Sequence, residues 1–182
     1  SMRAHNVEHL IWQTLAENEK MSVKKCYLRI LAKQLKKYEL HRLNKYDYLV
    51  PISAADEKIF KKLGCEIPMH VCPASFDEEL VKPDKTKEEF PSVFFIGALD
   101  WTPNIEGLNW FIERVWKIVI EKNPALKFYI AGRNCPDEFK QRKEKNLVVL
   151  GEVKSAVDFI NSKSIMIVPL FSGSGMRVKI IE

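Results

Sequence analysis

The chain has 182 residues, 46% of them apolar and 10% aromatic, a composition that excludes an intrinsically disordered protein. Its net charge of +5 is too small for a dedicated nucleic-acid-binding protein, so we expect no nucleic-acid partner. No apolar run approaches the roughly 20 residues that cross a bilayer, and the N-terminal residues lack the apolar core of a signal peptide, so we expect a cytoplasmic protein.

The segment from Lys20 to Lys45 combines a helical pattern with a local excess of positive charge. It contains nine basic residues and a single acidic residue, Glu39. Apolar residues recur at helical spacing from Val23 to Tyr38, with lysines around this apolar stripe. Two interpretations of the charge stay open. Residues 20–45 either make peripheral contact with an anionic membrane surface, on the inner face of the membrane, or form an ordinary solvated helix face.

Shorter apolar runs and turn residues organise the rest of the first half. Residues 48–52 and 69–72 are apolar, bounded by turn residues, and predict two strands. Ser53 is the expected N-cap of the helix between them, and Gly64 is the expected residue after its end.

Residues 76–91 are charged and without periodicity, which is typical of a linker between two domains. We therefore expect one domain in residues 1–75 and another in residues 92–182. In the second, four unbroken apolar runs alternate with helical patterns, which predicts an α/β fold with a Rossmann-like parallel sheet covered on both faces. Ligands of such sheets bind beyond the carboxyl ends of the strands.

The last strand of this pattern runs into Gly173-Ser174-Gly175 and the start of a helix. Backbone N–H groups and the helix dipole favour an anion at such a position. Arg177 and Lys179 lie in the first helical turn, where a cation opposes the dipole, and this indicates an anionic ligand such as a diphosphate. A tight turn with solvated basic residues is the alternative on physical grounds.

At these residues the chain resembles the retaining glycosyltransferases of the GT-B fold, family 4. Arg3-Ala4-His5-Asn6-Val7-Glu8-His9 resembles the active-site histidine segment of the acceptor domain. Phe95-Ile96-Gly97 and Ile130-Ala131-Gly132 resemble strand ends of the donor domain, and the segment from Gly173 to Glu182 is the most specific match. The resemblance implies a truncated fragment, with the C-terminal part of the acceptor domain in residues 1–75 and the first half of the donor domain in residues 92–182.

The resemblance also implies roles for single residues. His5 corresponds to the catalytic histidine near the transferred sugar, with a capping or core histidine as the alternative. Glu182 corresponds to the second Glu of the E-x7-E motif, which binds the donor ribose, and Ser174 stands where the first Glu would fall. Val153 corresponds to the segment that reads the base through its backbone, unless it is a plain turn residue. The other implied donor-binding positions are Lys179, Arg177, Gly175, Gly173 and Gly97.

The first loop of the expected donor domain departs from the family. Residues 98–107 lack the Arg and Lys with which many members grip the diphosphate, and Arg177 and Lys179 are expected to compensate. Asp100 and Asn104 are candidate contacts to acceptor or donor. Asn104 as a helix N-cap is the alternative.

The implied reaction is retaining glycosyl transfer from a nucleotide-sugar, such as a UDP- or GDP-sugar, to a glycan or lipid-linked acceptor. We expect no cofactor and no metal, because the four cysteines form no C-x-x-C pair and no carboxylate cluster occurs. The fragment alone is expected to be inactive and to self-associate through exposed apolar edges. The alternative functions are a non-catalytic nucleotide- or partner-binding α/β module and a peripheral membrane adaptor.

Overall fold

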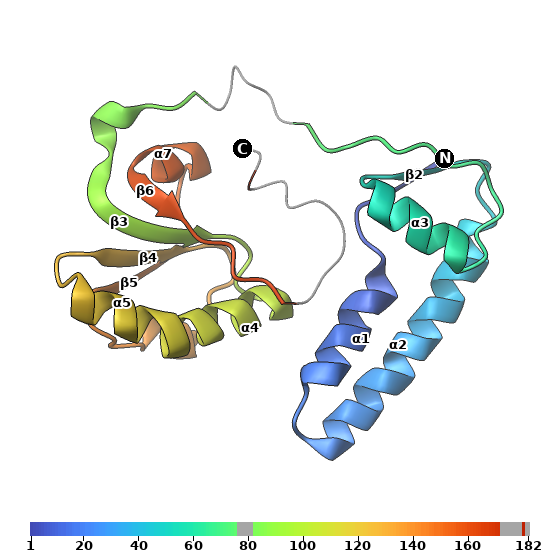
Figure 1. The fold of residues 1–182 in the computed structure, drawn as a ribbon, viewed down its shortest axis with the longest axis horizontal. Helices are drawn as coiled ribbons and strands as arrows, with labels where there is room; N and C mark the ends of the chain where they lie inside the picture. Colours follow the sequence, from blue (N-terminus) through green and yellow to red (C-terminus); the bar gives the residue numbers. More distant parts are fainter. Residues whose placement is uncertain (76–81, 172–179, 181–182) are drawn as a thin grey trace. The chain divides into compact units, whose positions relative to one another are not determined.

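The structure is a computed structural model that describes residues 1–75, 82–171 and 180. The described residues fall into two compact units, one containing residues 1–75 and the other residues 82–171 (Figure 1). Every strand pair in the described residues is parallel, and helices accompany the strands in both units. The expected α/β fold with a parallel sheet is therefore confirmed.

The first unit is a helical hairpin joined to a small parallel sheet (Figure 1). Its elements are β1 (Met2–Ala4), α1 (Glu8–Asn18), α2 (Ser22–Leu43), β2 (Leu49–Pro51) and α3 (Ala54–Lys62). β1 pairs with β2, and α1 packs along α2. In place of the strand expected at residues 69–72, the structure has a single parallel bridge from Met69 to Leu49.

Helix α3 begins and ends at the expected residues. The Ser53 hydroxyl accepts a hydrogen bond from the Asp56 N–H at 3.1 Å and donates to the Asp56 carboxylate at 2.6 Å. Gly64 follows the helix with φ +92°, a left-handed conformation that glycine adopts without a steric cost. Both assignments from the sequence are confirmed.

The apolar stripe of a helix ordinarily faces a core. In α2, however, the buried face is not the apolar stripe that the sequence pattern shows. The buried residues of α2 are Leu28, Ala32 and Leu43, and α1 is the helix packed against α2. The helix therefore has two apolar faces, and α1 covers only one of them. The other face, which we call the outer stripe, consists of four exposed residues: Val23, Tyr27, Ile30 and Tyr38.

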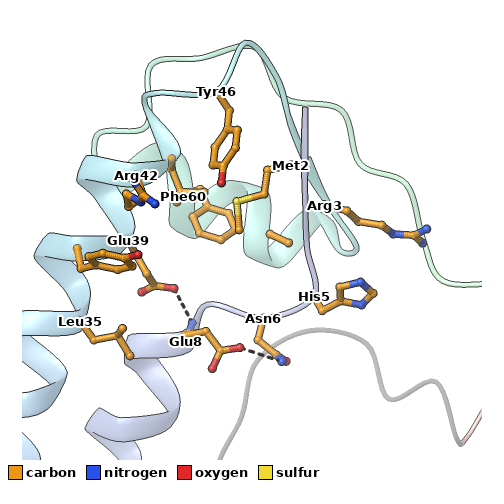
Figure 2. A pocket seen from close by; sticks show the side chains of 13 residues that line it. Met2, Arg3, His5, Asn6, Glu8, Leu35, Glu39, Arg42, Tyr46 and Phe60 are labelled. Carbon is orange, nitrogen blue, oxygen red and sulfur yellow. Dashed lines mark hydrogen bonds between the residues drawn. The ribbon is translucent and has the colours of Figure 1, made fainter.

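The carboxylate of Glu39 on α2 caps the N-terminus of α1. It accepts a hydrogen bond from the backbone N–H of Glu8 at 2.8 Å (Figure 2). It also accepts one from the backbone N–H of His9 at 3.1 Å. It also lies 2.6 Å from Nδ1 of His9, whose side chain is buried. Val7, the N-cap residue, offers no side-chain cap, so Glu39 supplies the acceptor for the first N–H groups of α1.

Replacing Glu39 by alanine removes this cap and leaves buried donors without their partner. We expect Glu39→Ala to lower the free energy of unfolding by about 2 kcal/mol, measured by urea denaturation. The matched control is Glu57→Ala on α3, which removes only an exposed i,i+4 pair with Lys61 and should cost about 0.5 kcal/mol or less. Equal losses in the two variants would contradict the capping role.

The second unit is built on a sheet of four parallel strands in the order β5-β4-β3-β6. The strands are β3 (Glu89–Ile96), β4 (Lys127–Ala131), β5 (Leu147–Gly151) and β6 (Lys163–Met166). They overlap the four apolar runs found in the sequence, and β6 begins and ends two residues before the run at residues 165–168. β3 begins at Glu89, so its first residues belong to the segment that the sequence pattern assigned to a linker.

Helical elements cover both faces of this sheet (Figure 1). In chain order they are η1 (Lys85–Lys87), α4 (Thr102–Trp110), the π-helical η2 (Phe111–Trp116), α5 (Lys117–Lys122), α6 (Asp137–Lys140) and α7 (Ala156–Asn161). Alternate strand residues enter two cores, because side chains of a strand point to opposite faces. Phe95 and Phe128 pack with residues of α4, η2 and α5, whereas Phe94 and Tyr129 pack with Phe159 of α7.

A cluster around Glu89 joins three strands at their amino ends. The Glu89 carboxylate accepts hydrogen bonds from the Lys163 ammonium at 2.6 Å, the Tyr129 hydroxyl at 2.8 Å and the Lys127 ammonium at 2.9 Å. The Lys163 ammonium also lies 3.9 Å from the centre of the Tyr129 ring. Hydrogen bonding from Lys163, above all, lowers the pKa of Glu89 to about 2.

This pKa predicts a loss of stability in acid. Between about pH 4.5 and pH 2 the unfolded chain binds a proton at Glu89 that the folded chain does not, so the free energy of unfolding falls as the pH falls through this window. Glu89→Gln should lower stability at neutral pH and flatten this dependence, as followed by urea unfolding at several pH values. Glu138→Gln, at an exposed position of α6, is the control and should keep the wild-type slope.

Candidate functional site

The four strands of the second unit end at one edge of the sheet, which we call the carboxyl edge. It consists of the segments that follow the strands: residues 97–101, 132–135, 152–154 and 167–171. The Gly97 N–H donates to the Ala131 carbonyl at 3.1 Å, and the Gly132 N–H donates to the Gly151 carbonyl at 2.7 Å. These bonds continue the hydrogen bonding between neighbouring strands past the strand ends. The loops after β3, β4 and β5 therefore start side by side.

Two glycines let these segments approach one another closely. A side chain at Gly132 would collide with the carbonyl of Gly97, and a side chain at Gly107 on α4 would collide with the carbonyl of Pro169. Gly97, a predicted donor-binding residue, therefore lies at the carboxyl edge in backbone contact with the neighbouring loop. The role of Gly97 toward a donor stays a prediction.

Asp100, a predicted contact residue, is exposed and is held by a residue that the sequence analysis missed. The Asn134 amide donates to the Asp100 carboxylate at 2.7 Å, and the Leu99 N–H donates to the Arg133 carbonyl at 2.9 Å. Asn134 has φ +54°, a conformation that Asn tolerates better than most residues. The connection between the two loops could have been predicted from one feature of the sequence, a Gly followed by Arg and Asn directly after a buried strand.

Arg133 brings a cation to the carboxyl edge. Its side chain is exposed, and its backbone is fixed to the loop after β3 by the hydrogen bond to Leu99. Residues 98–101 of that loop contain no Arg or Lys. A guanidinium next to this loop can bind the phosphate oxygens for which the loop itself offers no positive charge.

Asn104 is not the N-cap of α4, so that alternative is wrong. The helix begins at Thr102 with Trp101 at the N-cap position, because Pro103 suits the first turn of a helix. Asn104 is 3% exposed, and its amide donates to the Ala98 carbonyl at 2.7 Å. Its Oδ1 has no hydrogen-bond partner within residues 1–75, 82–171 and 180. Asn104 therefore braces the loop after β3 from inside, and its predicted contact with acceptor or donor is untested.

The side chain of Val153 packs against the core under α7, beside Phe94 and Phe159. Its backbone lies just beyond the end of β5. The predicted backbone contact of Val153 with a base is compatible with this position and stays a prediction.

His5 lies in the first unit, directly after β1, and is exposed (Figure 2). A core histidine is therefore wrong, and a capping role is wrong as well, since Val7 is the N-cap residue and Glu39 binds the first N–H groups of α1. His5 also lines a pocket of about 390 Å³, together with Arg42, Tyr38 and Tyr46. No pattern in the sequence indicates this pocket.

Six further predicted positions lie outside the described residues, so their roles stay predictions: Gly173, Ser174, Gly175, Arg177, Lys179 and Glu182. In the part of the chain that the structure describes, no group of three His, Cys, Asp or Glu side chains is arranged to hold a metal ion.

The close approach at Gly132 can be tested by stability. We expect Gly132→Ala to lower the free energy of unfolding by about 3 kcal/mol, because the new methyl group would collide with the backbone of Gly97. Gly151→Ala is the control. Gly151 has φ +69° but open space around it, so only the conformational cost of about 1 kcal/mol applies. Thermal or urea unfolding of both variants tests this expectation. A loss of stability in Gly132→Ala no larger than the loss in Gly151→Ala would refute the packing argument.

A parallel sheet with helices on both faces and its loops gathered at the carboxyl edge defines an α/β domain of the Rossmann-like, ligand-binding type. The family model for Glycosyl transferases group 1 matches residues 90–182, and the chain belongs to this family.

A 44.6 kDa protein encoded in the cps region of Klebsiella pneumoniae is 28% identical to this chain over 195 residues, which cover 100% of the chain and 48% of that protein. The chain thus spans about half the length of this curated relative.

Two solved structures share the fold. The crystal structure of TarM superposes with a TM-score of 0.63 at 16% identity, over 81% of this chain and 30% of TarM. A trehalose-6-phosphate synthase superposes with a TM-score of 0.53 at 11% identity, over 81% of this chain and 44% of that enzyme. The part of the chain that superposes accordingly has the fold of the GT-B glycosyltransferases.

Proposed function

We propose that the full-length gene product transfers a sugar, with retention, from a nucleoside-diphosphate sugar to a glycan or lipid-linked acceptor. The observation that carries the proposal is the carboxyl edge. Four parallel strands open there onto loops that are tied together by backbone hydrogen bonds, which is where α/β sheets bind their ligands. Membership of the glycosyltransferase family supports the same assignment.

The diphosphate of the donor is the group that this edge is suited to bind. Arg133 supplies an exposed guanidinium beside the loop after β3. By the family resemblance, Arg177 and Lys179 add two cations, and Glu182 binds the ribose. Cations held at the leaving diphosphate would stabilise the charge that develops as the glycosidic bond to the donor breaks, and this accounts for catalysis without a protein nucleophile.

The acceptor is proposed to be a growing surface glycan, free or lipid-linked. Two observations support this proposal: the relative from a cps region and the pocket beside His5, which presents aromatic and charged side chains. Tyrosine rings and a guanidinium are groups that contact sugars and their charged substituents. His5 is proposed to lie near the transferred sugar.

Calorimetric titration of the full-length gene product with UDP, GDP and ADP tests the donor site. We expect one nucleotide to bind, and Arg133→Ala, Lys179→Ala and Glu182→Ala each to weaken its binding about tenfold or more, because each removes a charge-assisted hydrogen bond. Lys117→Ala is the control. Lys117 is exposed on α5, away from the carboxyl edge, and its removal should leave binding unchanged.

A non-catalytic module is the second candidate, because the loop after β3 offers no cation of its own. If one nucleotide binds and no nucleotide-sugar is consumed with any glycan acceptor, this second function holds. If none of the three nucleotides binds, the donor site is refuted.

A further inference from the structure

The outer stripe of α2 is an apolar surface that α1 leaves uncovered. Val23 is 81% exposed, Tyr27 63%, Ile30 52% and Tyr38 58%. With 3.6 residues per turn, these four side chains fall within an arc of about 80°, which they share with the polar, exposed residues Gln34 and His41. The packed residues Leu28 and Ala32 fall on the opposite side of the helix.

Positive charge borders the outer stripe on both sides. Lys24 lies beside the stripe on one side, and Lys33 and Lys37 lie beside it on the other. All three residues are exposed. Neither Lys33 nor Lys37 forms a salt bridge with any residue that the structure describes. The single acidic residue of α2, Glu39, is turned toward α1 and binds its N-terminus. Lys24 is paired with Glu19, which precedes the helix, at 2.7 Å. On the side of Lys33 and Lys37, the exposed surface of α2 therefore combines apolar groups and cations without an acidic residue of the helix.

Further cations line a groove between α1 and α2, on the side of α2 that packs against α1 and away from the outer stripe. The volume of this groove is about 500 Å³, and Arg29, Lys33 and Lys36 on α2 line it together with Gln13 and Glu17 on α1. Three cations around one open groove favour an anionic group such as a phosphate.

We propose that α2 lies on an anionic bilayer surface, with the outer stripe among the acyl chains near the head groups and the lysines on lipid phosphates. An amphipathic helix with basic flanks binds such a surface in the plane of the interface. At about 33 Å, α2 is long enough to lie along it for its whole length. Among the described helices, none has the run of apolar residues that would let it pass through a membrane.

Charge and composition favour an anionic lipid surface over a protein as the partner of the outer stripe. A second copy would bring the same cations into contact, which repels. Seven of the nine basic residues between Lys20 and Lys45 are lysines, and lysine is depleted in protein interfaces. Tyr27 and Tyr38 have an apolar ring and a polar tip, as side chains at the level of lipid head groups do. The proposal goes beyond glycosyl transfer, because this surface needs neither nucleotide nor turnover.

Co-sedimentation of the full-length gene product with vesicles tests the proposal. Vesicles of phosphatidylcholine are compared with vesicles that also contain phosphatidylglycerol. We expect binding only with phosphatidylglycerol, and weaker binding as salt is raised. Lys33→Glu with Lys37→Glu, and separately Tyr27→Ser with Ile30→Ser, should each lower the partition coefficient about tenfold or more. All four positions are exposed, so circular dichroism should show an unchanged fold.

The matched control is Lys58→Glu with Lys62→Glu on α3, which makes the same charge change at the same spacing in the same unit. It should keep wild-type binding. Absence of binding, equal binding to both kinds of vesicle, or an equal loss in the control would each overturn the proposal. A change of oligomeric state in Tyr27→Ser with Ile30→Ser, measured by light scattering without lipid, would show that a second copy covers the stripe and would also overturn it. Nucleotide titration of the same variants is independent of these results, so failure of the donor site and failure of the membrane surface can be told apart.

Discussion

The capping of α1 by Glu39 is the interaction on which the first unit depends. One carboxylate satisfies the backbone N–H groups of Glu8 and His9 and binds the buried His9 ring, so it joins the segment after β1 to the middle of α2. The position of His5 at the end of β1 follows from this connection. So does the character of the exposed side of α2, because the only acidic residue of that helix is used on the inner side.

The second unit fastens the two edges of its sheet by different means. At the amino edge, charged side chains around Glu89 join β3, β4 and β6. At the carboxyl edge, backbone groups of Gly97, Gly132 and their neighbours make the connections, and glycines keep the contacts close. The side chains of Asn104 and Asn134 add to these connections, whereas the side chain of Arg133 is exposed and takes no part in them.

The sequence predicted those features that depend on local patterns. Unbroken apolar runs located the four strands of the parallel sheet, and a hydroxyl residue located a helix start at Ser53, whose side chain accepts a hydrogen bond from the Asp56 N–H. The buried face of α2 was not predictable, because Leu28 and Val23 belong to two apolar faces with the same period, and only the packing of α1 distinguishes them. The gathering of the loops at the carboxyl ends of the strands was also predicted, whereas the binding of a ligand there stays a prediction. Its internal connections, such as the one between Asp100 and Asn134, depend on loop conformations that no periodicity encodes.

The π-helical turn of η2 has a consequence for the carboxyl edge. Besides Pro103 and Gly107, the buried residues of the long helix form a series at every fourth position: Asn104, Leu108, Ile112, Trp116 and Ile120. In a regular α-helix this spacing would rotate the buried side by about 40° at each step, and the far end would leave the sheet. The wider turn at residues 111–116 corrects the phase midway, so both ends face the same core. The angular position of Asn104 beneath its loop is thereby coupled to the packing of Trp116, which lies on the other side of the widened turn.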